Sequence, residues 1–136
     1  MDWRPGAAPG VLAARAALLA TVRGFFAERG VLEVDTPTLA RTTVTEPAIE
    51  SVAAGSGWLQ TSPEYFMKRL LAAGSGPIYQ IARCFRAGEY GRLHNPEFLL
   101  LEWYRPGMDD GALMFEVDAL VGSLLPGFPA RRLAFR

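Results

Sequence analysis

Residues 84–106, CFRAGEYGRLHNPEFLLLEWYRP, constrain the fold of this chain more than any other stretch. Alternating apolar and polar residues flank a polar segment of about ten residues, which predicts a β-hairpin with strands over 77–86 and 97–104. Hairpin connections usually have only about two to five residues, and long ordered loops tend to be functional. The tip of the hairpin is therefore the first place to look for chemistry.

Alternation along the two expected strands gathers chemically useful side chains on one face of the hairpin. That face carries Phe98, Leu100, Glu102 and Tyr104 from the second strand, and Ala82, Cys84 and Arg86 from the first. An arginine can bind a phosphate through two hydrogen bonds and an aromatic ring can stack on a base, so this face suits a nucleotide. The same residues also fit a solvated face with surface ion pairs worth under about 1 kcal/mol each. The pattern alone leaves both interpretations open.

Helical periodicity marks both ends of the chain. A first helix is expected over 11–29, where apolar residues recur at three- and four-residue steps and Arg29-Gly30 forms a typical end. A last helix is expected over 114–124, with Asp109 or Asp110 as its N-cap and Pro126-Gly127 as its end. Residues 1–10, rich in Pro and Gly, are expected to form an extended arm, and residues 131–136 look like the start of a further element.

The middle of the chain predicts strands and one more helix. Residues 31–39, VLEVDTPTL, alternate as a strand that Pro37 ends, and the Thr-, Ala- and Gly-rich residues 40–57 are expected to be less regular. A short strand then leads into a helix with Thr61 or Ser62 as the N-cap, Pro63 at its first position and Gly74 as its stop. Together with the hairpin, these elements predict an α+β fold in which helices flank an antiparallel sheet.

Composition and charge exclude several classes of protein. With 136 residues and a formal net charge of +0, the chain has the size of one domain and no overall basic field for sequence-independent nucleic-acid binding. The single cysteine, Cys84, excludes an internal disulfide framework and a cysteine-only metal site, and no metal ligand is assigned. The sequence shows neither a secretory leader nor an uninterrupted apolar run of the roughly 18 residues that a membrane span needs. The expectation is a cytoplasmic protein without a membrane segment.

Three segments, in order, resemble class II aminoacyl-tRNA synthetases of the lysine type. FR…HNPEF…LEWYRP, within about 78–106, looks like motif 2, and ERGVLEVDTPTL, within about 22–39, looks like motif 1. TSPEYFMKRLLAAG looks like the substrate-binding segment between the two motifs. The resemblance implies that residues 1–136 form the N-terminal part of a class II catalytic domain, because motif 3 has no counterpart in the chain. It also implies a homodimer with motif 1 at its interface.

Four stretches, WRP, SPEYFMKRLL, GRLHNPEF and LEWYRP, are further similar to the EpmA family, also called PoxA or GenX. That family consists of stand-alone lysyl-tRNA synthetase paralogues that attach (R)-β-lysine to a lysine of translation elongation factor P. The resemblance implies an ATP-dependent ligase that activates lysine or β-lysine as an adenylate, with elongation factor P as the acceptor. It also implies Mg²⁺ bound with ATP, on ligands outside this chain. Because no OB-fold domain precedes motif 1, tRNA is not the expected partner.

Two alternatives stay open beside this interpretation. One is the catalytic core of a lysyl-tRNA synthetase that charges tRNA. The other is a degenerate, non-catalytic module with a synthetase-like fold that dimerises or binds a partner.

The resemblance implies roles for two groups of residues. Arg86 is the expected catalytic residue, which would bind the α-phosphate of ATP and stabilise the charge that develops there. The expected ATP-binding group is Arg86, Ala87, Gly88, His94, Asn95 and Phe98, with Phe98 stacked on adenine. The expected amino-acid-binding group is Ser62, Pro63, Glu64, Glu102 and Tyr104, with Glu64 on an ammonium and Tyr104 near the side-chain amine.

Purely structural interpretations exist for the same side chains. Glu64 in the first turn of a helix is favoured by the helix dipole, His94 can brace the loop, and Tyr104 can be a packing residue. Cys84 is expected to be a small buried hydrophobe.

Gly88 is a departure from the family pattern, which has a glutamate at this position of motif 2. Loss of one charged hydrogen-bonding partner is worth about 1.5–3 kcal/mol, so nucleotide binding is expected to weaken by about one to two decades. Together with the missing motif 3, this substitution predicts weak or absent activity for the 136-residue chain alone.

Overall fold

The computed structural model describes residues 3–127 and contains both helices and antiparallel strands, so the α+β class is confirmed. Two compact units divide the chain: the two ends form one, and Val31–Pro106 form the other. The expected element at 131–136 lies outside the described residues, as do the first two residues of the expected N-terminal arm.

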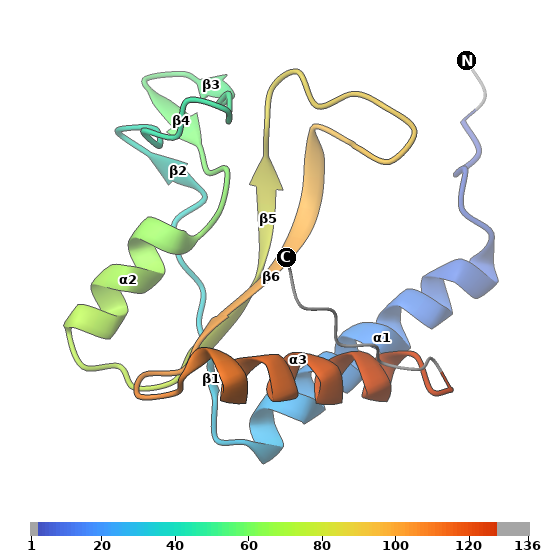
Figure 1. Cartoon of the computed structure of the whole chain (residues 1–136). Coiled ribbons are helices and arrows are strands. Elements are labelled where there is room, and N and C mark those ends of the chain that lie inside the picture. The colour runs from blue at the N-terminus through green and yellow to red at the C-terminus, as the bar shows by residue number, and fades with distance from the viewer. Residues whose placement is uncertain (1–2, 128–136) are drawn as a thin grey trace, which may run out of the picture. The chain divides into compact units, whose positions relative to one another are not determined.

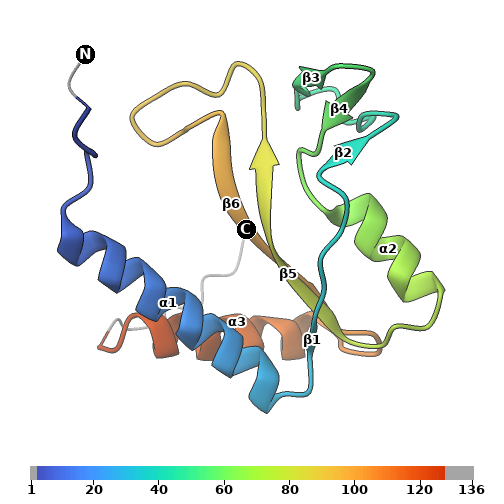
Figure 2. The same ribbon diagram turned by 180° about the vertical axis from the view of Figure 1, so that it is seen from behind.

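The Val31–Pro106 unit is built on the hairpin (Figure 1). Strand β5 (Ile78–Phe85) pairs antiparallel with β6 (Glu97–Tyr104), in a register that sets Ile78 opposite Tyr104 and Phe85 opposite Glu97. Strand β1 (Leu32–Glu33) pairs parallel with the other side of β5, as the view from behind shows (Figure 2). The order β1-β5-β6 gives β5, whose residues are the most buried of the three strands, the central position.

A second small sheet lies in the same unit, within and at the two ends of the stretch 40–57 that was expected to be less regular. Strands β2 (Leu39–Ala40), β4 (Gly57–Leu59) and β3 (Ala53–Ala54) form it in the order β2-β4-β3, and all pairs are antiparallel. Residues 41–52 contain neither helix nor strand, as expected for a less regular stretch, and β4 is the short strand expected before the helix. The pairing of Ala53–Ala54 as a strand was not expected. Thr-, Ala- and Gly-rich strands this short lack the alternation that identifies a strand in a sequence, because their pairing depends on the neighbouring chain.

The strand that was expected to begin near Val31 and to end at Pro37 is shorter than expected. Only Leu32–Glu33 belong to the ladder with β5, and the Val34 N–H still donates to the Tyr79 carbonyl at 2.9 Å. Leu39–Ala40 pair instead with β4 in the second sheet. Pro37 lies between the two pairings, and a proline cannot donate a ladder hydrogen bond.

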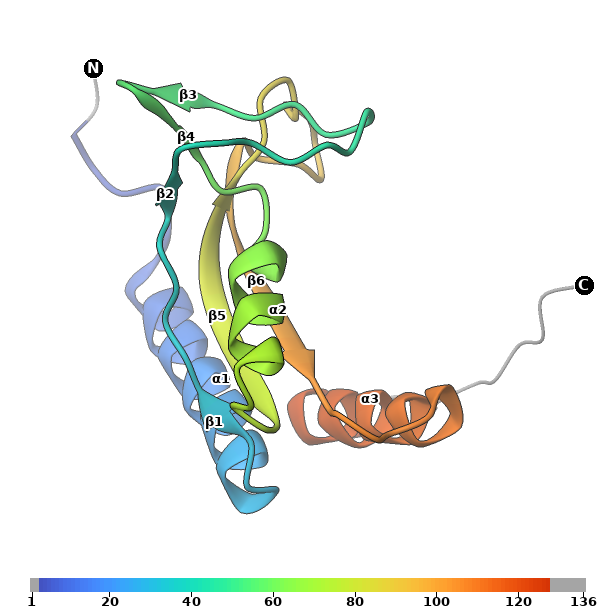
Figure 3. The ribbon, with the colours of Figure 1, turned by 90° about the vertical axis from the view of Figure 1, so that its left-hand side faces the viewer.

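Helix α2 (Glu64–Ala72) follows β4 directly (Figure 3). Its N-cap is Pro63, so the assignment of the cap to Thr61 or Ser62 and of Pro63 to the first helical position is wrong by one or two residues. The Ser62 Oγ nevertheless accepts a hydrogen bond from the Glu64 N–H at 3.3 Å, which is the contact that a capping hydroxyl makes. Gly74, with a φ of 86°, follows the end of the helix as expected.

The other unit contains two helices, α1 (Pro9–Glu28) and α3 (Asp110–Leu124), which contact each other. Helix α1 begins at Pro9 rather than Val11, since proline fits the first helical position, and Arg29 with Gly30 ends it as expected. Asp109 is the N-cap of α3, and its carboxylate accepts from the Ala112 N–H at 2.7 Å.

Helix α1 is unusually apolar for its length. By length and composition alone it is apolar enough to cross a membrane, because Arg15 and Arg23 interrupt the apolar run without making the helix polar overall. This is weak evidence for a membrane span, since a core helix or a helix at a protein interface meets the same criterion.

The core of the Val31–Pro106 unit gathers under α2 and along β5. Its fully buried side chains are Pro63, Met67, Ile78 and Cys84. Burial raises the pKa of the Cys84 thiol to about 11, so this cysteine stays protonated at neutral pH and is a poor nucleophile. The expectation of a small buried hydrophobe at this position is confirmed.

Candidate active site

Arg86 lies where β5 ends and the hairpin loop begins. Its backbone N–H donates to the Pro96 carbonyl at 2.9 Å, and its Nε donates to the Thr61 carbonyl at 3.3 Å. Its guanidinium carbon lies 5.1 Å from the centre of the Phe98 ring, in the range of a cation–π contact. A third contact is the ion pair with Glu89, at 3.6 Å between Arg86 Nη1 and Glu89 Oε1. The cation is therefore oriented by the backbone on one edge and by an aromatic face on the other.

The loop after Arg86 borders an open cavity of about 470 Å³. Its lining residues are Arg86, Glu89, Leu93, His94, Asn95 and Phe98. Reciprocal backbone hydrogen bonds between Gly91 and His94, at 3.1 and 3.3 Å, keep the tip of the loop folded. Four of the six residues expected to bind ATP thus share one cavity.

Ala87 and Gly88 do not line that cavity. The Ala87 N–H donates to the Glu50 carbonyl at 2.8 Å, so this part of the loop is bound to the segment before β3. Gly88 has a φ of 76°, a left-handed conformation in which a glutamate would be strained. The departure from the family pattern at this position is therefore matched by a backbone that favours glycine.

A second cavity, with an empty volume of about 560 Å³, lies at the start of α2. Its lining residues are Val44, Thr45, Glu46, Ile49, Thr61, Ser62, Glu64 and Tyr65. A hydrogen bond of 3.2 Å between the hydroxyls of Thr45 and Tyr65 ties its two walls together. Ser62 and Glu64 are brought together here, whereas Pro63 is buried and outside the lining.

Glu102 and Tyr104 interact on β6. The Tyr104 hydroxyl donates to Glu102 Oε1 at 2.7 Å, and both side chains are partly buried. Desolvation raises the pKa of the Glu102 carboxyl, the Tyr104 hydrogen bond opposes that rise, and the charge of Glu64 adds to it. Burial, followed by the hydrogen bond to Glu102, raises the pKa of Tyr104, so its hydroxyl stays a proton donor at neutral pH.

The Glu64 carboxylate is paired with Lys68 one turn further along α2. The hydrogen bond to Glu64 and the charge of Glu64 raise the pKa of the Lys68 ammonium, with a smaller contribution from Glu102. Glu64 and Glu102 therefore repel each other and share the attraction of one cation. Such a pair of carboxylates favours the binding of a positively charged group between them.

Tyr104→Phe is expected to raise the pKa of Glu102 further. The pKa of Glu102 is higher in the folded than in the unfolded chain, so the protonated carboxyl stabilises the folded state. This stabilisation is fully present below the unfolded-state pKa and is lost as the pH rises through the folded-state pKa. Removal of the Tyr104 hydroxyl takes away the hydrogen bond that stabilises the carboxylate and moves this loss to higher pH. An NMR titration of the Glu102 carboxyl carbon measures the shift.

Tyr90→Phe, at an exposed tyrosine of the hairpin loop, is the matched control and should leave the pKa of Glu102 unchanged. A Glu102 pKa that falls or stays unchanged in Tyr104→Phe contradicts the assigned hydrogen bond.

Several neighbours of the site were not identified from the sequence. Lys68 follows Glu64 by four residues on α2, the spacing at which side chains on one face of a helix meet. Glu89 follows Arg86 by three residues but lies in the hairpin loop, where this spacing predicts no contact. Gln60 and Glu46 carry no sequence signal of a role. Among residues 3–127, no group of three or more His, Cys, Asp or Glu side chains is arranged to hold a metal ion.

A family model for class II tRNA synthetases of the D, K and N types matches residues 1–131, and the chain belongs to this family.

Its curated relatives include proteins named elongation factor P–(R)-beta-lysine ligase. The relative from Photorhabdus laumondii is 52% identical over 145 residues, which cover 99% of this chain and 45% of the relative. Relatives from Erwinia tasmaniensis and Yersinia pestis are each 51% identical with the same coverage. The chain therefore spans somewhat less than half the length of the curated relatives that it matches.

Proposed function

We propose that the protein containing this chain is an ATP-dependent ligase that activates lysine or β-lysine and transfers it to a lysine of elongation factor P. The observation that carries the proposal is the cavity in which the Arg86 guanidinium and the Phe98 ring lie 5.1 Å apart. A cation for phosphate beside an aromatic face for a base is what ATP requires. The names and identity of the relatives support the choice of amino acid and acceptor.

The reaction begins with attack of the amino-acid carboxylate on the α-phosphorus of ATP. A carboxylate oxygen–phosphorus bond forms, the bond to the β-phosphate oxygen breaks, and pyrophosphate leaves. Arg86 stabilises the negative charge on the α-phosphate oxygens, and its orientation by the Thr61 carbonyl avoids reorganisation during the reaction. Phe98 stacks on adenine, while His94 and Asn95, which line the same cavity, contact the phosphates.

The amino-acid substrate binds beside Ser62 and Glu64. Glu64 pairs with an ammonium of the substrate, and Glu102 with Tyr104 receives the other amine. The raised pKa of Glu102 and its repulsion by Glu64 favour such a cation in this region. In the second step the acceptor lysine amine attacks the adenylate carbonyl, and AMP leaves with the bonding electrons.

Mg²⁺ binds together with ATP in this proposal, but residues 3–127 contain no group of three or more His, Cys, Asp or Glu side chains that could coordinate it. Its proposed ligands are ATP itself and residues outside this chain. The domain assignment is likewise part of the proposal: motif 1 within about 22–39 and motif 2 within about 78–106.

A homodimer formed through motif 1 and a cytoplasmic location complete the proposal. Motif 1 begins in the last part of α1, and the exposed apolar side chains earlier in the same helix, among them Val11, Leu12 and Leu18, support a second copy as the group that covers it. The same contact would account for the apolar composition of α1.

A second candidate is a non-catalytic module with the same fold. The observation that favours it is Gly88, whose φ of 76° does not suit the glutamate of the family pattern. A tRNA-charging enzyme is the remaining alternative, and the acceptor assay below separates it from the ligase.

Pyrophosphate exchange with the intact protein that contains residues 1–136 tests the proposal. Exchange is expected with lysine or (R)-β-lysine, followed by transfer of the labelled amino acid to elongation factor P and not to tRNA. Transfer to tRNA alone identifies the charging enzyme. An absence of exchange with any of these amino acids, together with no heat of ATP binding in calorimetry, identifies the non-catalytic module and contradicts the ligase.

A further inference from the structure

The segment between β4 and α2 is joined to the end of β5 by hydrogen bonds that meet at Gln60. The side-chain Nε2 of Gln60 donates to the Arg83 carbonyl at 2.9 Å. Its backbone carbonyl accepts from the Phe85 N–H at 2.9 Å, and its own N–H donates to the Thr38 carbonyl at 2.8 Å. With only 7% of its surface exposed, Gln60 makes these contacts away from water.

The residue after Gln60 holds Arg86. The Thr61 carbonyl accepts from the Arg86 Nε at 3.3 Å, and Thr61 itself is 2% exposed. Ser62 and Glu64, on the wall of the second cavity, follow immediately. A single short run of chain therefore carries the anchor of the arginine and the residues proposed to bind the amino acid.

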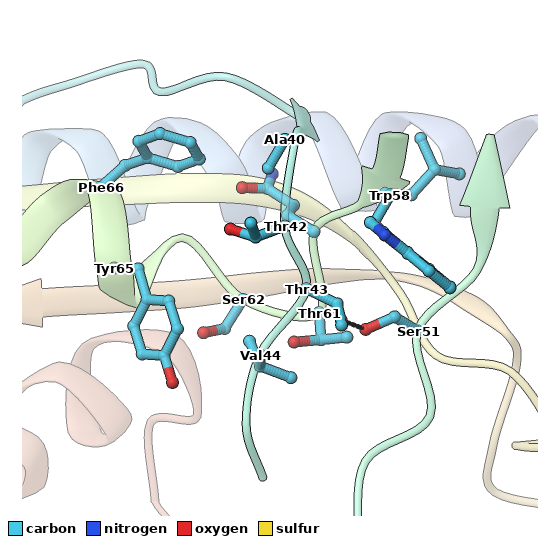
Figure 4. Close-up of a pocket in the computed structure, with 12 residues that line it drawn as sticks. Ala40, Thr42, Thr43, Val44, Ser51, Trp58, Thr61, Ser62, Tyr65 and Phe66 are labelled. Carbon is cyan, nitrogen blue, oxygen red and sulfur yellow. Dashed lines mark hydrogen bonds between the residues drawn. The ribbon is translucent and has the colours of Figure 1, made fainter. Parts of the chain in front are cut away.

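Gln60 is not the side chain that stability alone would favour. Its Oε1 is buried without a hydrogen-bond partner in the described part of the chain, and a buried unpaired polar atom costs free energy. The cavity beside it is lined by further polar groups, including the hydroxyls of Thr42, Thr43, Ser51, Thr61 and Ser62 (Figure 4). Thr43 and Ser51 are hydrogen-bonded to each other there. An apolar residue of the same volume would avoid the cost of the unpaired oxygen but would lose the bond to Arg83.

We propose that Gln60 is a positioning residue for Arg86. The Gln60 amide donates to the Arg83 carbonyl and so holds the last residues of β5 against the Gln60–Thr61 backbone. The Thr61 carbonyl then orients the Arg86 guanidinium toward the phosphate, while Ser62 and Glu64 bind the amino acid. This inference rests on the proposed ligase function, because it assigns to Gln60 an effect on adenylate formation.

Gln60→Met in the intact protein tests it kinetically. The kcat of adenylate formation is expected to fall roughly three- to tenfold, the equivalent of one hydrogen bond. The KM values for ATP and for the amino acid are expected to stay within about twofold, since the Gln60 side chain lines neither of the two proposed binding cavities. Gln60→Glu, which keeps the shape and loses the donor, should share the loss of kcat.

Thr36→Val is the matched control. It removes another buried hydrogen bond to β5, from Thr36 Oγ1 to Gln80 Oε1 at 2.9 Å, away from Arg86. We expect it to lower stability and to leave kcat unchanged at a temperature where all variants are folded. A kcat in Gln60→Met and Gln60→Glu that falls no further than in Thr36→Val overturns the proposal.

A second measurement does not depend on catalysis. The NMR signal of the Arg86 Nε–H should exchange with water faster in the Gln60 variants than in the wild type and Thr36→Val. If the wild type forms no adenylate but the Arg86 Nε–H of the Gln60 variants still exchanges faster than that of the wild type, the ligase assignment fails and the positioning of Arg86 by Gln60 stands. Unchanged protection in both Gln60 variants overturns the positioning role even if the wild type is active.

Discussion

Arg86→Ala is expected to lower kcat/KM for adenylate formation by about 10²–10³-fold in the intact protein. This is the usual cost of removing one preorganised group that stabilises developing charge, because water cannot replace a donor held in a fixed direction. The guanidinium of Arg86 has that fixed direction, with its Nε on the Thr61 carbonyl and its plane near the Phe98 ring. Pyrophosphate exchange with saturating amino acid measures the effect. Arg86→Lys should recover only part of the lost activity, since an ammonium cannot form the two parallel hydrogen bonds that a planar guanidinium makes to a phosphate.

The matched control is Arg83→Ala on the same strand. Arg83 points to the opposite face of the hairpin and pairs with Glu97, and more than half of its side-chain surface is exposed. Loss of such a surface pair should change stability by less than about 1 kcal/mol and leave the rate within about threefold. Equal rates for Arg86→Ala and the wild type would remove the catalytic assignment, whatever the fate of Arg83→Ala.

Met67→Ala is expected to have the largest effect on stability, a loss of about 2–5 kcal/mol in the free energy of unfolding. Met67 is fully buried and is the buried residue of α2, so its side chain is the main attachment of this helix. The alanine leaves a cavity that the surrounding strands can fill only in part. Urea denaturation followed by circular dichroism measures the loss, and affinity for the amino acid should weaken as well, because Glu64 opens the same helix.

Leu32→Ala is the control for this measurement. This substitution removes an apolar side chain of similar size to Met67, but 59% of the surface of Leu32 is exposed. The expected change in the free energy of unfolding is therefore within about 0.5 kcal/mol. A loss for Met67→Ala no larger than that for Leu32→Ala contradicts the role of Met67 as the anchor of α2.

The hairpin and the helices could be predicted because their signals are local. Alternation over 97–104 fixed which residues face together, and the register with Cys84 opposite Phe98 and Gln80 opposite Glu102 agrees with the expected face. The N-cap at Asp109 followed from its side-chain chemistry. Of the small sheet, only β4 was expected, as the short strand before α2; β2, β3 and their pairing with β4 could not be predicted, because strands of two residues are stabilised by their partners and not by their own pattern.

The site was predictable to a similar extent. Resemblance led to Arg86, His94, Asn95 and Phe98, which line one cavity, but it gave no indication that Ala87 and Gly88 lie outside it. It also missed Gln60, whose importance depends on a carbonyl of another strand and therefore on tertiary structure. The family roles of the site residues stay predictions, and the substitutions above test the most specific of them.

The parallel pairing of β1 with β5 has a consequence for how the chain folds during synthesis. Glu33 and Tyr79, which are joined by a side-chain hydrogen bond across this pair, are 46 residues apart, whereas β5 and β6 meet through one loop. Closing the longer loop costs more entropy, so the hairpin is expected to form early and β1 to dock onto it later. Until β5 leaves the ribosome, the first strand has no partner, and nascent chains arrested before that point should be the ones most exposed to proteolysis.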